Sequence, residues 1–372
     1  MNDRILVTRT YMPPWEEYTK EIRDLWESRW ITNMGVKHEQ LRAALLDCLG
    51  VDRLELFVNG HMGIELTLQA FGFPEGSEII TTPFTFASTT HAIVRNGLQP
   101  VFCDVLPDSG VMDPDQIESL ITEKTKAILP VHVYGNICDV DAIRQIADRH
   151  ELKVIYDAAH AFGEKYRGRQ VGLFGDASCF SFHATKVFHS IEGGAVAYRD
   201  PAFGKILYQL KNFGIRDAET VDGIGANAKM NEFCAAMGLC NLRHMEEIIH
   251  ARRNVTEWYR ERLTGIPGVR ILLAANDVES NYAYFPVTFD KTGFGKTRDD
   301  VFRALDNAGI GARKYFYPLT SSFDCFRGRF DPLKTPEALA IAESVLTLPL
   351  YPDLAKEDVD RICGIVRSCR MD

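Results

Sequence analysis

The sequence predicts an α/β protein in which a large, mainly parallel sheet precedes a smaller α+β domain. At 372 residues the chain is longer than one ordinary domain. Through its first two thirds, apolar strand-like runs alternate with amphipathic helical runs, which is typical of parallel βαβ units covered on both faces. After the glycine- and proline-containing turn at 265–268 the order of elements changes, so a second domain is expected there.

The elements of the first part follow from short apolar runs and from helical periodicity. Buried strands are predicted at 78–82, 100–105, 127–133, 153–157 and 178–182. Helices are predicted at 61–73, 113–121, 139–150 and, as one long helix, about 231–263. Asp113 and Pro114 supply an N-cap and a first-turn proline for the second of these helices.

The second part and the N-terminus complete the expected organisation. Strands are predicted at 282–289 and 312–317, and helices at 297–305, 336–346 and 355–369. We expect an N-terminal arm (1–30), a large domain (31–264) and a small C-terminal domain (265–372). The arm is dense in aromatic side chains, which need an apolar surface to pack against. They are Trp15, Tyr18, Trp26 and Trp30. That surface belongs either to the chain's own large domain or to a partner subunit.

Composition excludes several classes of function. Apolar residues make up 46% and charged residues 25%, as in soluble globular proteins. We expect neither a secretory signal nor a membrane span, because no sufficiently long apolar run is present. Nine cysteines, an odd number without a CxxC pair, favour reduced thiols in the cytoplasm and no metal site. The net charge of −9 argues against nucleic-acid binding.

A single lysine lies in the middle of a stretch that otherwise reads as strand, turn and strand, SFHATKVFHSIEGGAVAY at 181–198. Lys186 is unfavourable in such surroundings unless its charge is paired or its pKa is lowered. Lysines that act as nucleophiles occur in this setting. A lysine that extends from a loop into solvent is the alternative, and this stretch alone does not separate the two.

Three further segments make chemical sense if they meet Lys186. Asp157 ends a very apolar strand and needs a cation opposite it, unless it only caps the next turn. The Asn-Gly turn in VNGHMGIEL (58–66) leads into a helix whose free N–H groups can bind phosphate. TTPFTFASTTHAI (81–93) places Phe86 at the carboxyl edge of the sheet, where ligands bind in open α/β sheets. A lysine, a buried acid, a phosphate cup and an aromatic face are what pyridoxal 5'-phosphate requires.

Four motifs of the chain together resemble those of a known protein family. They are SFHATK…EGGA, YDAAHAFG, PVHVYGN and GANAKMNEFCAAMG. The chain resembles, over nearly its whole length, the DegT/StrS family of sugar-nucleotide aminotransferases, which have the type I aminotransferase fold. The resemblance implies that Lys186 binds the cofactor aldehyde covalently and later moves protons, while Asp157 pairs with the pyridine nitrogen. It also implies that His160 lies near the phenolic oxygen and that Phe86 stacks on the ring. The phosphate would then be held by Ser181, Gly60, His61, Met62 and, from a neighbouring subunit, Asn227.

The same resemblance implies a homodimer with shared active sites and a set of substrate contacts, Tyr315, Tyr317, Lys229 and His183. The chain also departs from the family pattern. Phe213 and Thr320 stand where histidine is frequent, and His61 and Met62 stand where many relatives have smaller residues. These departures weaken the assignment of substrate contacts and crowd the phosphate cup.

The function implied is pyridoxal-phosphate-dependent transamination of a nucleotide-linked keto-deoxyhexose, with glutamate or glutamine as amino donor. Within the family, three segments look most like those of enzymes that act at C4 of a dTDP-4-keto-6-deoxyhexose: TRTYMPP, WITNMG and SFHATKVF. Amination at C3 is the alternative. A dehydratase of the same fold would have histidine in place of Lys186. A non-catalytic sugar-nucleotide-binding scaffold would be expected to lose Lys186 or Asp157, and both are present.

Overall fold

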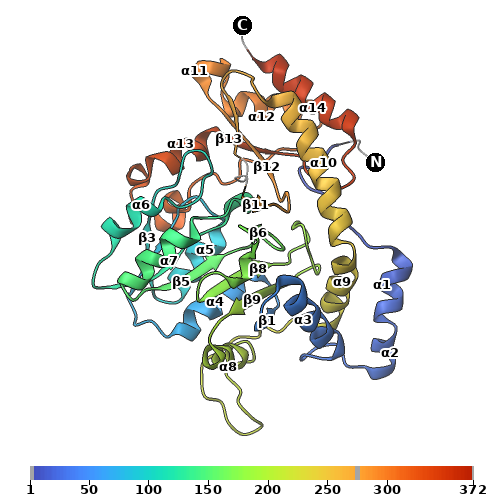
Figure 1. The fold of residues 1–372 in the computed structure, drawn as a ribbon, viewed down its shortest axis with the longest axis vertical. Helices are drawn as coiled ribbons and strands as arrows, with labels where there is room; N and C mark the ends of the chain where they lie inside the picture. Colours follow the sequence, from blue (N-terminus) through green and yellow to red (C-terminus); the bar gives the residue numbers. More distant parts are fainter. Residues whose placement is uncertain (1–3, 273–276, 371–372) are drawn as a thin grey trace.

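A computed structural model describes residues 4–272 and 277–370, and its centre is a seven-stranded sheet (Figure 1). The strands of this sheet are β1 (Leu54–Phe57), β2 (Glu78–Thr81), β3 (Gln99–Phe102), β4 (Thr125–Leu129), β5 (Lys153–Asp157), β8 (Ala177–Ser181) and β9 (Gly194–Tyr198). Their order is β1-β9-β8-β5-β4-β2-β3. All neighbours from β8 to β3 pair in parallel, whereas β9 pairs antiparallel with both β8 and β1. The predicted mainly parallel sheet and the α/β class are confirmed.

Helices cover both faces of this sheet. They are required because successive apolar side chains of a strand point to opposite faces, and both faces must be buried. In β5, Val154 and Tyr156 pack into one core and Ile155 into the other. The Ile155 face is covered by α4 (Gly60–Phe71), α5 (Ala87–Arg95) and α8 (Pro201–Leu210). The opposite face is covered by α3 (Val36–Leu49), α6 (Pro114–Ile117), α7 (Val140–Arg149) and α9 (Glu232–Arg243).

A second, antiparallel sheet lies at the other end of the molecule (Figure 1). Its strands are β10 (Val269–Ile271), β12 (Phe285–Phe289) and β13 (Val345–Leu348). Around it lie α10 (Met245–Leu263), α11 (Lys291–Phe294), α12 (Arg298–Asn307), α13 (Pro336–Ser344) and α14 (Lys356–Cys369). Its core includes Val255, Tyr259 and Leu263 of α10, so this long helix contributes to both halves of the chain. A third, small sheet joins β6 (Lys165–Tyr166), β7 (Arg169–Gln170) and β11 (Val278–Glu279).

The N-terminal stretch crosses from the second sheet to the large one. Ile5 pairs with Ile310 and belongs to the core of the second sheet. Helix α1 (Trp15–Ile22) then packs on α9, where Tyr18 Oη donates to the Phe233 carbonyl at 3.2 Å. Helix α2 (Asp24–Ser28) follows, and three arm tryptophans stay largely exposed: Trp15 at 73%, Trp26 at 66% and Trp30 at 58%. The arm therefore covers part of its own chain and still leaves aromatic surface free.

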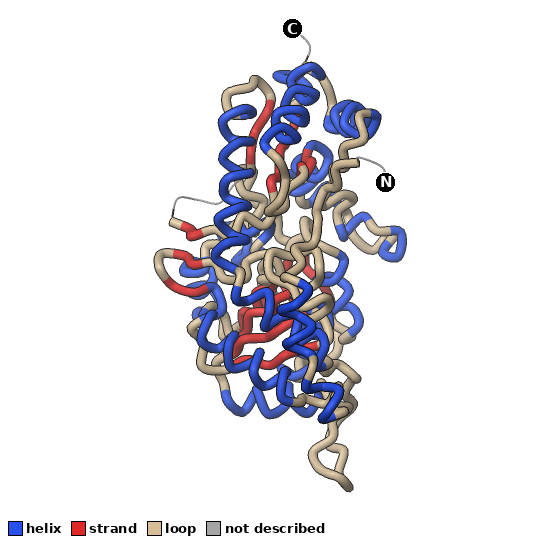
Figure 2. The backbone as a smooth tube through the Cα atoms, turned by 90° about the vertical axis from the view of Figure 1, so that its right-hand side faces the viewer, coloured by secondary structure: helices blue, strands red, loops and turns tan. Residues whose placement is uncertain are grey.

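Two sequence predictions were wrong in detail. The helix expected without interruption at 231–263 breaks at His244 into α9 and α10. The strand expected at 312–317 does not form, because only Arg313 pairs there, with Thr347, and Phe316 turns into the core. The extended segment 211–231 connects α8 to α9; its middle extends away from the rest of the chain (Figure 2), while its ends, at Lys211 and Ala228, are buried. Among the described residues, no helix has the length and apolar character needed to cross a membrane.

Candidate active site

A cavity of about 290 Å³ opens at the carboxyl ends of β5 and β8. Parallel strands end at the same edge of a sheet, so the loops that follow them meet there. The cavity brings together most of the predicted site residues: Gly60, His61, Phe86, Asp157, His160, Ser181, His183, Lys186 and Tyr315. Arg313, Glu192 and Ser88 also line it, and none of these three was predicted to bind cofactor or substrate.

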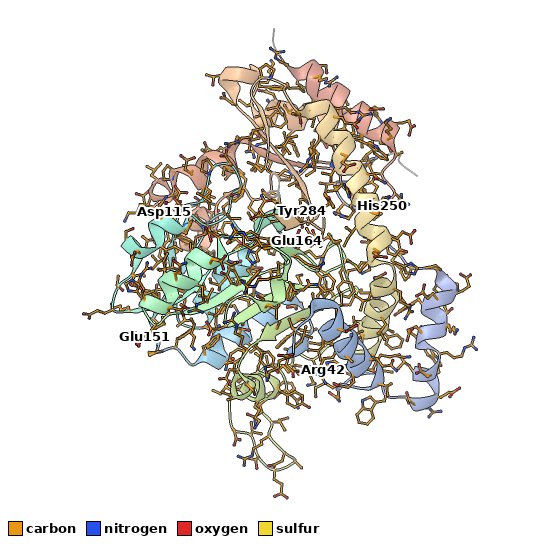
Figure 3. The ribbon with its side chains drawn as sticks, viewed as in Figure 1. Arg42, Asp115, Glu151, Glu164, His250 and Tyr284 are labelled. Carbon is orange, nitrogen blue, oxygen red and sulfur yellow. The ribbon has the colours of Figure 1, made fainter. Side chains whose placement is uncertain are left out.

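Lys186 lies in the loop between β8 and β9, where its amide donates to the His183 carbonyl at 2.8 Å. Its Nζ is 3.5 Å from the Tyr284 hydroxyl and 5.9 Å from the centre of that ring. Tyr284 immediately precedes β12 and lies between the large sheet and the second sheet (Figure 3). Tyr284 was not among the predicted site residues, because a tyrosine near the start of a predicted strand gives no signal of its own.

Asp157 is 4% exposed at the end of β5. Its Oδ2 accepts from Thr89 Oγ1 at 2.7 Å and its Oδ1 from the Ala159 amide at 3.1 Å. Burial raises the pKa of Asp157, and the two hydrogen bonds and the Lys186 charge oppose that rise. No Lys, Arg or His side chain of the described residues lies within 4.0 Å of the carboxylate, so the site has room for a cation that the chain itself does not supply.

His160 is buried and neutral on the cavity wall. Its Nδ1 accepts the Tyr134 N–H at 2.9 Å, so the ring proton is on Nε2 and can be donated. Burial and then the nearby Lys186 charge lower the pKa of His160 well below its usual range. Asn281 Nδ2 donates to the His160 carbonyl at 2.9 Å, and Glu164 accepts the Asn281 amide at 3.0 Å. This network fixes the loop that carries His160.

The start of α4 forms the other end of the cavity. The Asn59 side chain caps the helix by accepting the Met62 amide at 2.8 Å. The free N–H groups at this helix start are therefore those of Gly60 and His61. A Cβ at position 60 would lie 2.9 Å from Ser181 Cβ, so the close approach of helix and strand requires glycine. The prediction that the Met62 amide contributes to phosphate binding needs correction, because that N–H is already used.

The remaining predicted residues lie outside this cavity. Tyr317 is 48% exposed, with the Arg298 guanidinium 4.8 Å from its ring centre. Lys229 Nζ donates to Asn212 Oδ1 at 2.6 Å, and Asn227 is exposed nearby on the extended segment 211–231. Lys229 and Asn227 therefore do not line the cavity of their own chain.

A second, wider depression lies beside α1 and α2 and has a different character. It measures about 660 Å³ and is lined by Glu17, Lys20, Glu21, Arg23, Asp24, Glu27, Lys37 and Arg243. Lys37 pairs there with Glu21 at 3.0 Å, and Arg243 pairs with Glu17 at 2.6 Å. Its charges compensate one another, so it is a solvated ion-pair network rather than a reaction site.

The residues of the first cavity fit pyridoxal 5'-phosphate. A buried carboxylate without a cationic side chain suits a protonated ring nitrogen, and two free amides beside Ser181 suit a phosphate. Phe86, 55% exposed in the cavity wall, offers a flat apolar face, and Lys186 offers an amine. With the mainly parallel seven-stranded sheet, this site defines a pyridoxal-phosphate-dependent enzyme of the aminotransferase class.

Comparison with known proteins makes the assignment specific. The model of the DegT/DnrJ/EryC1/StrS aminotransferase family matches residues 15–367, and the chain belongs to that family. It is 40% identical over 370 residues to dTDP-4-amino-4,6-dideoxy-D-glucose transaminase of Shigella dysenteriae, with 100% of each chain covered. Its fold matches DesI, solved in the presence of its TDP-sugar product, with a TM-score of 0.93, 34% identity and 99% and 93% of the two chains covered.

A third comparison bears on the cofactor. The sugar aminotransferase Spr1654 of Streptococcus pneumoniae, solved in its PLP form, matches with a TM-score of 0.89 and 26% identity, covering 97% of this chain and 98% of the other. The predicted family, enzyme class and cofactor are thereby confirmed: the chain is a pyridoxal-phosphate-dependent aminotransferase.

Proposed function

We propose that this enzyme transfers the amino group of glutamate or glutamine to C4 of a dTDP-4-keto-6-deoxyhexose. The main support for this reaction type is that Lys186 and Asp157 line the same cavity, because transamination needs both a mobile amine and a fixed anion. The relative from Shigella dysenteriae, which matches the chain from end to end, supports the nucleotide and the position of amination. Nine free cysteines support a reducing compartment, and we place the enzyme in the cytoplasm.

In the first half of the reaction the protein must take a proton from the donor's α-carbon and return one. Pyridoxal 5'-phosphate, when bound, supplies the aldehyde that receives the amino group and a ring that accepts electrons. Lys186, once its amine is free, is the base at short range, and the Tyr284 hydroxyl 3.5 Å away orients that amine. Asp157, held by Thr89 and the Ala159 amide, keeps a negative charge fixed at the ring-nitrogen end.

In the second half the same residues act in reverse on the sugar ketone. Lys186 returns a proton to the sugar carbon, so one side chain serves both halves. The neutral His160, with its proton on Nε2, donates a hydrogen bond into the cavity without adding charge. The Gly60 and His61 amides with Ser181 would hold the cofactor phosphate while the two substrates exchange.

A panel of nucleotide keto-sugars offered with glutamate tests the substrate proposal. We expect stoichiometric release of 2-oxoglutarate with a dTDP-4-keto-6-deoxyhexose and a product whose new C–N bond lies at C4 by NMR. A reaction without sugar is the control, because it allows a single turnover per site only. A C3-aminated product would replace our proposal with the alternative regiochemistry. Absence of any turnover, together with tight sugar-nucleotide binding, would favour a scaffold.

We further propose that the enzyme is a homodimer with shared active sites. Exposed apolar side chains on the extended segment 211–231 support this, with Ile224 90%, Val221 65% and Phe213 47% exposed. Asn227 is exposed on the same segment and lines no part of the cavity of its own chain. Both observations are accounted for if this segment packs against a partner subunit and places Asn227 at the partner's cavity. The exposed tryptophans of the arm add further apolar surface.

Substituting Asn227 by alanine tests the shared site. We expect the dissociation constant of the cofactor to rise about 10- to 150-fold, because the phosphate loses one hydrogen bond to a charged group. Mixing Lys186→Ala chains with Asn227→Ala chains at limiting cofactor should restore activity, since one site of each heterodimer then has both residues. Glu219→Ala, exposed on the same segment, is the matched control and should bind cofactor normally. A fully active monomer by light scattering would contradict the proposal.

A further inference from the structure

The short linker that leads into β12 brings a hydroxyl group to the reactive lysine. Tyr284 is the last residue of this linker, which comprises residues 280–284 between β11 and β12. Its hydroxyl lies 3.5 Å from Lys186 Nζ, and its ring centre lies 4.6 Å from that of His160. Tyr282 has a φ of 56°, in the left-handed region that residues other than glycine rarely adopt. A linker in such a conformation persists only where the surrounding structure fixes it.

A buried arginine fixes the linker directly before Tyr284. Arg252 lies on α10 and is 4% exposed. It donates from Nε to the Tyr282 carbonyl at 2.9 Å and from Nη2 to the Ala283 carbonyl at 2.7 Å. Burial lowers the pKa of Arg252 to about 10, so the guanidinium stays charged at neutral pH. In the described part of the chain no carboxylate pairs with this charge, and the linker carbonyls are its partners.

A second set of buried contacts joins the linker to the loop that carries His160. Glu164 is fully buried and accepts the Asn281 amide at 3.0 Å and the Ser280 hydroxyl at 3.2 Å. Asn281 Nδ2 donates to the carbonyls of His160 at 2.9 Å and Phe162 at 3.0 Å. The linker is therefore held both to α10 and to the cavity wall, which restricts where its last side chain can lie.

Packing alone does not account for an arginine at position 252. An apolar side chain would fill the same space without the cost of burying a charge. What the guanidinium adds is a pair of directed hydrogen bonds to successive carbonyls, next to Tyr284. Arg252 does not line the cavity, so it reaches the chemistry only through the residues that it holds. A displacement of about 1 Å at a reacting group can reduce a rate about 100-fold.

We propose that Arg252 is a positioning residue: it holds Tyr284 so that the tyrosine hydroxyl orients the Lys186 amine. This rests on the role proposed above for Tyr284 and does not depend on the identity of the donor or the sugar. The step on which it acts first is attachment of the cofactor. The neutral amine of Lys186 forms a C=N bond to the aldehyde carbon, and the aldehyde oxygen leaves as water with the two amine protons.

Stopped-flow absorbance of cofactor-free enzyme mixed with saturating pyridoxal 5'-phosphate tests this in a double-mutant cycle. We expect Arg252→Lys and Tyr284→Phe each to slow attachment by roughly 10- to 100-fold, because an ammonium cannot form the paired contact and phenylalanine has no hydroxyl. The double variant should be no slower than Tyr284→Phe, since Arg252 acts through that hydroxyl. Losses that multiply in the double variant would mean that Arg252 acts on the fold in general and would overturn the proposal.

Pyridoxine 5'-phosphate, which has an alcohol in place of the aldehyde, binds without reacting and separates binding from attachment. Its dissociation constant by calorimetry should be unchanged in every variant. Arg253→Gln is the matched control, because Arg253 is the exposed neighbour of Arg252 and pairs with Glu257 at 2.9 Å. It should attach the cofactor at the wild-type rate. Wild-type rates in Arg252→Lys or Tyr284→Phe would overturn the proposal, as would a loss of pyridoxine 5'-phosphate binding that accounts for the slower attachment.

Arg252→Gln, which keeps a hydrogen-bond donor without the charge, is a second variant for the same cycle. It should also slow attachment only where Tyr284 is present. Circular dichroism establishes that each protein is folded, and failure of both Arg252 variants to fold would make Arg252 a structural residue and overturn the positioning role. Attachment involves neither donor nor sugar, so a wrong assignment of either substrate would leave these results unaffected.

Discussion

Lys186→Ala is expected to reduce transamination by more than ~10⁴-fold, the upper end for loss of a general acid–base group. The amine at this position both holds the cofactor and moves the proton, and no second lysine lines the cavity in the described residues. The phosphate contacts and Asp157 remain, so the variant should still bind cofactor without a covalent bond. Stopped-flow absorbance with glutamate, and the loss of the band of lysine-bound cofactor, are the measurements.

The control for this substitution is Lys205→Ala, on the exposed side of α8, which should behave as wild type. Thermal unfolding should show little change for Lys186→Ala, because the side chain is only partly buried and, among residues 4–272 and 277–370, bonds only to the Tyr284 hydroxyl. Turnover above a trace in Lys186→Ala would remove this residue from the mechanism and return it to the role of a lysine that extends into solvent.

Asp157→Asn is expected to lower the rate of both half-reactions by about 10²- to 10³-fold, or roughly 3–4 kcal/mol of barrier, the scale for losing one preorganised electrostatic partner. The amide has nearly the same shape: its oxygen can accept the Ala159 N–H, and its nitrogen can donate to Thr89 Oγ1, which reverses that hydrogen bond. The main change is the loss of the negative charge, so the ring nitrogen no longer stays protonated. Single-turnover kinetics with glutamate, read by absorbance, measure the loss.

A second buried aspartate supplies the control for Asp157. Asp104 is 3% exposed and accepts the Glu337 and Ala338 amides at the start of α13, at 3.0 Å and 2.8 Å. Asp104→Asn should therefore lower stability, through the lost interaction with that helix start, and leave the half-reaction rates alone. Full activity in Asp157→Asn would mean that the carboxylate merely caps the turn at Ala159.

Without cofactor, the effect of Asp157→Asn on stability should depend on pH. Burial raises the folded-state pKa of Asp157, so the folded chain keeps its proton to higher pH than the unfolded chain does. Below the unfolded-state pKa of Asp157, about 4, its carboxyl group does not lower the free energy of unfolding. As the pH rises from there through the raised folded-state pKa, the group lowers the free energy of unfolding progressively. Asparagine has no such cost. The melting temperature of the variant relative to wild type should rise between pH 4 and pH 7.

Much of the fold could be predicted from local patterns. The strand predicted at 153–157 matches β5, and the helix predicted at 139–150 matches α7 to within a residue, with Asp139 as its N-cap. These elements bury a face that recurs at the period of a helix or strand, so their signal is local. The strand predicted at 312–317 was wrong because aromatic residues are frequent in strands. In the structure, Phe316 and Tyr315 instead pack among the rings that line the cavity.

The sequence by itself determined the chemistry, because lysine, aspartate and a glycine-led helix start are recognisable from residue type and from their place at strand ends. Only the tertiary structure decided which groups remain available to react. Asn59 uses the Met62 amide, Tyr134 fixes the tautomer of His160, and Tyr284 and Arg313 reach the Lys186 cavity from the other side of the molecule. Such contacts join residues far apart in the chain, and hydrogen bonds and exposure depend on spatial neighbours that no local pattern specifies.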